Sequence, residues 1–157
     1  MAKIDTVRIA ITRSDGGVSL MDFVTREYAS SEGSGWTREP TLEAVNATIA
    51  KANLDSVSWR FIDKNEVPED RTFRNAWKPD LTVDMPKARD IHRKTLRRAR
   101  APLLASLDFE FMRAVETNDT ARMAEITAQK QALRDITDHP GIEAATTPEE
   151  LLAIKIG

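Results

Sequence analysis

The stretch from Asp84 to Leu133 constrains the fold of this chain most, because it has the pattern of two long helices joined by a tight polar turn. Asp84 is a good helix cap, since its side chain can accept hydrogen bonds from the first free amides, and Pro86 fits the first turn. Apolar side chains then recur every third or fourth residue. The predicted stripe of this helix consists of Ala88, Ile91, Thr95, Leu96, Ala99, Leu103, Leu107, Phe111 and Val115.

Pro102 interrupts this stripe. A proline inside a helix removes one hydrogen bond and collides with a carbonyl one turn earlier, so the sequence predicts a kink or a break near residues 98–101. The polar run Thr117-Asn118-Asp119 then ends the helix and caps the next one. Two antiparallel helices follow from so short a turn. The apolar face predicted for the second helix carries Met123, Ile126, Lys130 and Leu133.

Two sequence patterns predict the structure of the last residues of the chain. His139-Pro140-Gly141 is expected to stop the second helix. Thr147-Pro148-Glu149-Glu150 has the form of a capping box, which predicts a short last helix carrying Leu151, Leu152 and Ile154. We expect this helix to dock, either on the chain itself or on a neighbour.

The first residues have the pattern of a β-hairpin over residues 3–24. Val7, Ile9 and Ile11 alternate with Arg8, Ala10 and Thr12, as in a strand with one buried face. Asp15-Gly16-Gly17 supplies the positive φ angles of a tight turn, and Val18 and Leu20 begin the partner strand. Residues 25–40 have no sustained period and carry Ser and Gly, which predicts a mobile loop. Trp36 in this loop is a candidate binding anchor, or it folds back over the core.

A short helix and a third strand follow the loop. Residues 41–52 have helical spacing, with Leu42, Val45 and Ile49 on one face. The alternation of Val57, Trp59 and Phe61 predicts the strand.

The aromatics Phe73 and Trp77 lie four residues apart and predict a helical turn that pins both to the head. Lys78-Pro79-Asp80 marks a boundary, after which residues 81–83 could add a short strand. The sequence thus predicts an α+β protein with two parts. Residues 1–80 form a small α/β head of hairpin, short helix and strand, and residues 81–157 form a long, Pro-kinked helical hairpin with a short terminal helix.

Composition excludes several classes of function. The chain of 157 residues has 41% hydrophobic and 31% charged residues, which is typical of a folded globular protein. It has no cysteine, so disulfides, thiolate metal sites and cysteine nucleophiles are excluded. Its net charge of -2 gives no global attraction for nucleic acid or membrane. The amino terminus resembles neither a signal peptide nor a membrane span, so we expect the protein to be made in a cytosol.

The one strong charge patch spans residues 87–100, with seven Lys or Arg and a single acid, Asp90. Four arginines, Arg89, Arg93, Arg97 and Arg100, step by four, four and three residues, which predicts a ridge on one helix face. The ridge could meet an acidic protein surface, track the phosphates of DNA or RNA, or be a solvated face with acidic partners elsewhere on the chain. If Arg93, Arg97 and Arg100 meet a protein partner, reversing their charge should abolish binding and leave the fold intact.

Signals for catalysis are weak. His92 and His139 have no other ligand at metal-binding spacing, so we expect no metal site. Ser34 lies between two glycines but lacks the strand-to-helix elbow of a hydrolase nucleophile. The sequence also has no phosphate-cradling glycine loop. We therefore expect neither a catalytic site nor a cofactor, and predict that the protein is not an enzyme.

Residues 73–77 (FRNAW), 84–108 and 129–151 resemble a group of small tailed-bacteriophage and prophage proteins. The motif Gln131-Ala132-Leu133-Arg134-Asp135-Ile136 is also similar to the closing motif of phage tail assembly chaperones and tail-fibre assembly proteins. The resemblance implies a structural or assembly role, with other virion proteins as partners, a location in the virion and synthesis in the host cytoplasm.

Three hypotheses follow. The chain is a virion component of the tail or neck, a transient chaperone of a tail or fibre protein, or a nucleic-acid-binding accessory protein that uses the arginine ridge. We expect self-association or a stable complex with another virion protein, because a two-helix hairpin leaves a flank of each helix uncovered. We expect no membrane partner.

Overall fold

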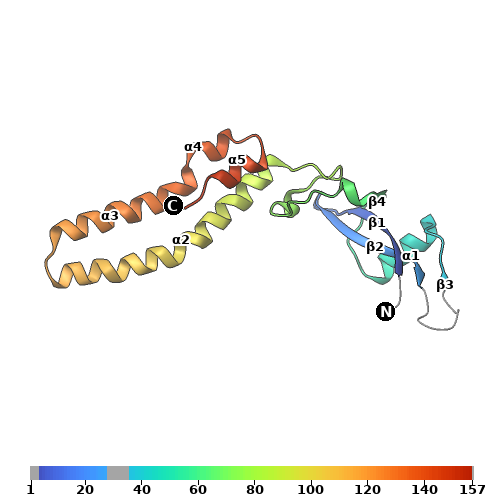
Figure 1. The fold of residues 1–157 in the computed structure, drawn as a ribbon, viewed down its shortest axis with the longest axis horizontal. Helices are drawn as coiled ribbons and strands as arrows, with labels where there is room; N and C mark the ends of the chain where they lie inside the picture. The colour runs from blue at the N-terminus through green and yellow to red at the C-terminus, as the bar shows by residue number, and fades with distance from the viewer. Residues whose placement is uncertain (1–3, 28–35, 157) are drawn as a thin grey trace. The chain divides into compact units, whose positions relative to one another are not determined.

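A computed structural model describes residues 4–27 and 36–156 of the chain. The chain divides into two compact units, a head of residues 1–83 and a helical unit of residues 84–157. The sheet lies in the head and the long helices in the helical unit, so the predicted α+β class is confirmed (Figure 1). Residues 81–83, expected in the second part, belong to the head.

The head contains a four-stranded antiparallel sheet in the order β3-β2-β1-β4. The predicted hairpin is confirmed, and its turn places Gly16 at a φ of 73°, where glycine is favoured. The strands are β1 (Ile4–Thr12), β2 (Val18–Glu27), β3 (Trp36–Thr37) and β4 (Ser58–Ile62).

The loop predicted over residues 25–40 is wrong at residues 25–27 and 36–37, and its residues 28–35 lie outside the described residues. Residues 25–27 extend β2, and Trp36 pairs with Glu27 in β3. Without β3, β2 would be an edge strand with free backbone donors and acceptors, and a returning chain can pair with these whatever its side chains are.

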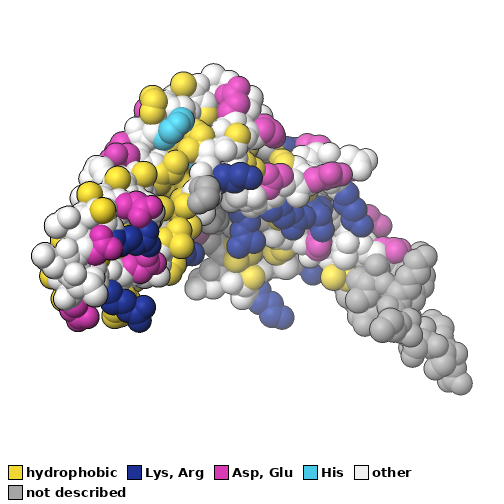
Figure 2. Space-filling model, turned by 60° about the vertical axis from the view of Figure 1, so that its left-hand side comes forward, with side chains coloured by type: hydrophobic (Ala, Val, Ile, Leu, Met, Phe, Trp, Pro, Cys, Tyr) yellow, Lys and Arg dark blue, Asp and Glu magenta, His cyan; other side chains and the backbone are white. Residues whose placement is uncertain are grey.

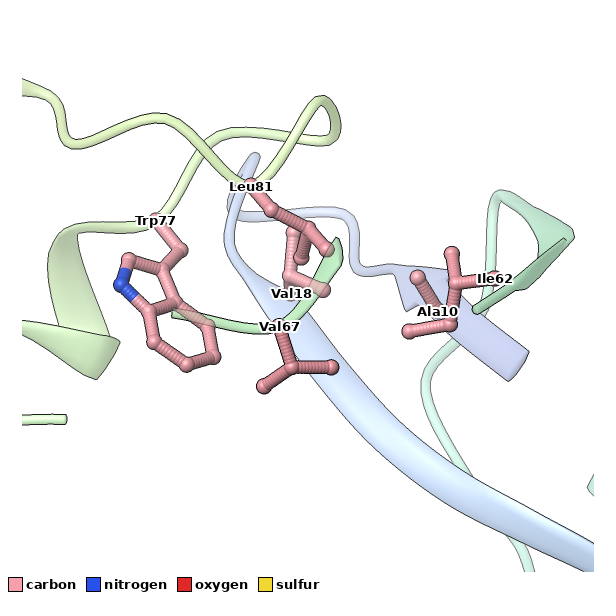
Figure 3. Close-up of a cluster of buried hydrophobic side chains, with 6 residues drawn as sticks. All are labelled: Ala10, Val18, Ile62, Val67, Trp77 and Leu81. Atoms are coloured by element: carbon pink, nitrogen blue, oxygen red, sulfur yellow. The ribbon is translucent and has the colours of Figure 1, made fainter. Parts of the chain in front are cut away.

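Both faces of β1 are buried, whereas its alternation predicts one. Ile9 and Ile11 pack with Phe23 beneath α1 (Leu42–Lys51), which contributes Val45 and Ile49. Ala10 lies on the other face, where the segment after β4 covers the sheet. Figure 3 shows this second cluster, which consists of Ala10, Val18, Ile62, Val67, Trp77 and Leu81.

The covering segment holds two single helical turns, η1 (Lys64–Glu66) and η2 (Arg74–Ala76). Phe73 and Trp77 flank η2 and are buried, so the prediction that a helical turn pins both aromatics to the head is confirmed. Residues 81–83 form no strand, and a single bridge joins Val83 to Trp77.

The helical unit begins with the predicted hairpin, α2 (Met85–Glu116) and α3 (Thr120–Asp135), which lie side by side and antiparallel (Figure 1). The side chains of Asp84 and Asp119 cap the two helices as expected. Pro102 does not break α2, which stays continuous and bends along its length. Because Pro102 is exposed, the missing hydrogen bond lies on the solvent side of the helix.

The predicted stripe of α2 is correct only in part. Leu96 and Ala88 are buried, but Leu103 and Val115 are exposed. Steps of four residues drift by about 40° each around a helix, so the line from Leu103 to Val115 crosses the inner side of α2 at the partly buried Leu107 and Phe111 and leaves both of its ends exposed. In α3, Ile126 is fully buried against this interface.

The end of the chain folds back on α2. The capping box between Thr147 and Glu150 is confirmed, and it starts α5 (Pro148–Ala153), which packs on α2 through buried Leu151. His139-Pro140-Gly141 ends the preceding turn η3 (Ile136–Asp138) but also begins a short helix, α4 (Pro140–Ala144), that the sequence analysis did not predict.

Acidification should loosen this docked end. Hydrogen bonds from Thr146 and Thr147 lower the pKa of the Glu150 carboxyl below its ordinary value of 4.5. A carboxyl whose folded pKa is lowered stabilises the fold above its unfolded pKa, and this contribution is lost as the pH falls through the folded value. We expect the thermal stability of Glu150→Gln to depend less on pH below about 4.5 than that of the wild-type chain. Equal pH profiles in differential scanning calorimetry would contradict this.

Candidate functional site

Two arginines of the predicted ridge hold α4 against α2. The Nη2 of Arg89 donates to the carbonyl of Ala145 at 2.9 Å, and its Nη1 lies 3.7 Å from Glu143. Arg93 forms an ion pair with the same carboxylate and a longer one, 3.4 Å, with Asp90. Both side chains are therefore engaged inside the unit.

Arg100, farther along α2, binds the end of α3. One nitrogen, Nη1, donates to the carbonyls of Leu133 at 3.2 Å and Arg134 at 2.6 Å and to the hydroxyl of Thr137 at 3.3 Å. These carbonyls lie in the last turn of α3, where the helix dipole favours a cation. Arg100 thus fixes the end of α3 on α2.

His92 ties the last residues to the same helix. It is buried, and its Nε2 lies 2.9 Å from the carbonyl of Ile154. A carbonyl only accepts hydrogen bonds, so Nε2 is the protonated nitrogen in this contact. His92 has a structural role here.

The four arginines therefore do not form one exposed ridge. Arg97 is exposed, whereas Arg89, Arg93 and Arg100 are partly buried and engaged within the helical unit. Together with Lys94 and Arg98, Arg97 makes up the exposed basic surface of α2, and no hydrogen bond or ion pair engages these three side chains within the described part of the chain. Binding of a partner through the arginines stays a prediction.

The backbone of Trp36 lies in β3, but its side chain lies outside the described residues. Its role as a binding anchor also stays a prediction.

The most exposed large apolar residues of the helical unit lie on α2, where the sequence analysis had not placed a site. Phe109 is 74% exposed and Met112 58%. A signal for this existed, since Phe109 lies two residues from both Leu107 and Phe111 and so points to the opposite side of the helix.

A second apolar feature lies along α3. A cavity of about 330 Å³ is lined by Gln129, Ala132, Leu133, Ile136 and Ile156. Figure 2 shows hydrophobic side chains gathered in a strip, with acidic and basic side chains along its left side.

The head carries a basic cavity of about 340 Å³ that the sequence analysis also missed. Its lining includes Arg13, Arg71 and Arg74, together with Ser19 and Trp77. Arg13 is already paired with Asp15. The indole nitrogen of Trp77 is buried without an acceptor and points away from the apolar cluster in Figure 3.

Within residues 4–27 and 36–156, no group of three or more His, Asp or Glu side chains is placed to hold a metal ion. None of the helices described is both long and apolar enough to cross a membrane.

The contacts predict effects of different size on stability for Arg97 and Arg100. Arg100→Glu should lower the free energy of unfolding by about 1–3 kcal/mol, because it removes hydrogen bonds from a charged donor and places a carboxylate beside two carbonyls. Arg97→Glu, which loses no contact, should change it by less than about 0.5 kcal/mol. Urea denaturation followed by circular dichroism measures both. This corrects the expectation that reversing Arg93, Arg97 and Arg100 together leaves the fold intact, and equal stability of the two variants would contradict the contacts described.

Comparison with known proteins adds no relative. No family, curated protein or solved structure matches the chain.

Proposed function

We propose that this chain is a non-enzymatic structural component of a tailed-phage virion, in the tail or neck, whose helical hairpin packs against neighbouring subunits. The phage context rests on the resemblance of residues 73–77, 84–108 and 129–151 to small phage proteins. The packing role rests on one observation, the exposure of Phe109 and Met112 on α2. Large apolar side chains that adjoin one another on a surface favour contact with another protein.

Mass spectrometry of purified virions tests the proposal. The particles should come from the phage or induced prophage whose genome encodes this chain. A virion component is expected at many copies per particle, at a constant ratio to the other tail proteins. Absence from complete particles, with the protein present in the lysate, would overturn the proposal.

That second outcome would favour a transient assembly chaperone. The observation behind this alternative is the apolar cavity lined in part by Ala132, Leu133 and Ile136. These residues belong to the motif that resembles the closing segment of tail assembly chaperones, and a groove of this kind suits an apolar segment of a client protein. A chaperone should co-purify with an unassembled tail or fibre protein and leave when assembly is complete.

A further inference from the structure

The outer face of α2 has a pattern that is complementary to itself. The side chains that pack on α3 lie on one side of the helix, and Phe109 lies half a turn away from them. On this outer face, small residues separate a basic end from an apolar and acidic end. Along the chain its exposed residues are Lys94, Arg98, Ala101, Ala105, Phe109, Met112 and Glu116.

The charged residues of this face are available for a partner. Within the described residues, the side chains of Lys94, Arg98 and Glu116 take part in no hydrogen bond or ion pair. The basic and acidic ends are separated by the 18 positions between Arg98 and Glu116. An antiparallel copy of the same helix would therefore bring opposite charges together at both ends.

We propose that this face binds the same face of a second copy, antiparallel, about a two-fold axis at the level of Leu107. Phe109 then packs on the partner's Ala105, and Met112 on the partner's Ala101. Arg98 meets the partner's Glu116. Because the contact is isologous, each of these pairs occurs twice. The inference rests on the proposed function and names a second copy as one neighbour of the hairpin.

The charges and the side-chain sizes on this face favour an antiparallel pair of α2 helices over a parallel one. A parallel pair in register would place Arg98 against the partner's Arg98 and Phe109 against the partner's Phe109, which joins like charges and leaves the small residues unfilled. In the antiparallel pair, the basic end of each helix, with Arg98, lies opposite the acidic end of its partner, with Glu116.

One face of one helix buries less area than a standard stable interface. We therefore expect a weak dimer, with a micromolar to millimolar Kd, which repeated contacts in a larger assembly would reinforce. Sedimentation must be followed over a wide range of protein concentration to detect it.

Sedimentation equilibrium of the full chain provides the first test. Phe109→Ser should weaken the dimer at least about tenfold, since it removes the central apolar contact of each half. Leu103→Ser is the matched control, because Leu103 is also exposed on α2 but lies about 120° around the helix from Phe109 and about 180° from Met112. Arg98→Glu and Glu116→Arg should each weaken the dimer, and the double variant should restore it.

Because the chain has no cysteine, a single introduced cysteine can be labelled specifically. This allows a second test, which measures how the two α2 helices are aligned in the dimer. Spin labels on Ser106→Cys should lie close together in the dimer, because the two sites are about 3 Å apart along the helix axes. Labels on Thr95→Cys should be separated by about 36 Å along the axes. A parallel pair would bring both labelled sites close.

A chain that stays monomeric up to millimolar concentration overturns the pairing, as does a dimer that Phe109→Ser leaves unchanged or that the double charge swap fails to restore. None of these results decides whether the chain is part of the virion, which the mass spectrometry of particles tests separately.

Discussion

Ile126→Ala is expected to lower the free energy of unfolding of the helical unit by about 2–5 kcal/mol. The side chain of Ile126 is 0% exposed in the interface between α3 and α2, so its truncation removes apolar contacts and leaves a cavity. Urea denaturation followed by far-ultraviolet circular dichroism measures the change.

Leu103→Ala is the control for this truncation. Leu103 is 44% exposed on α2, so its loss should cost less than about 1 kcal/mol. If Ile126→Ala and Leu103→Ala had the same stability, the packing of the hairpin described above would be wrong.

Trp77→Ala should destabilise the head by about 3–5 kcal/mol. Trp77 is 4% exposed and belongs to the cluster that covers one face of the sheet, so its truncation removes apolar contacts and leaves a cavity. Hydrogen exchange of the amides in β1 and β2 provides a local measurement, because the logarithm of their exchange rates should rise in proportion to the lost stability.

Trp77→Phe separates the contribution of the aromatic ring to stability from that of the indole N–H group. It retains most of the apolar volume and removes an N–H group that has no acceptor, so it should cost much less than Trp77→Ala. A Phe variant as unstable as the Ala variant would indicate that the indole nitrogen makes a contact that stabilises the head.

The parts of the fold that the sequence predicted depend on local chemistry. The caps at Asp84, Asp119 and Thr147 need only a side-chain acceptor within three residues of a free amide, and the turn at Gly16 needs only a positive φ. Each of these signals depends on only a few neighbouring residues. The helices α1, α2, α3 and α5 and the β-hairpin could therefore be predicted with almost correct bounds.

The errors concern contacts between distant segments. The ion pair of Arg93 with Glu143 joins residues 50 positions apart, and no local pattern shows that α4 exists to receive it. In the same way, the burial of Ala10 depends on Trp77 and Leu81, which arrive from the end of the head.

The candidate site was only partly accessible to sequence reasoning. Counting by four and three placed Arg89, Arg93, Arg97 and Arg100 on one ridge, and the helical angle agrees, because the four lie within about 80° of one another. Only the contacts with α4 and with the end of α3 show which arginines are engaged. The helical angle could also have predicted that Phe109 lies opposite Leu107 and Phe111. The helical angle does not show which side of α2 is covered by α3. The covered side decides which residues of α2 stay exposed to a partner.

The division into two units also separates the chromophores of the chain. All three tryptophans, Trp36, Trp59 and Trp77, and the single tyrosine, Tyr28, belong to residues 1–83, whereas the helical unit has only phenylalanine among the aromatics. Indole fluorescence therefore reports on the head alone, while the helical dichroism comes mainly from residues 84–157. Recorded on one sample, the two signals distinguish a concerted transition from two separate ones. A proteolytic fragment that begins at Asp84 would have almost no near-ultraviolet absorbance, so its detection needs a dye or absorbance of the peptide bond.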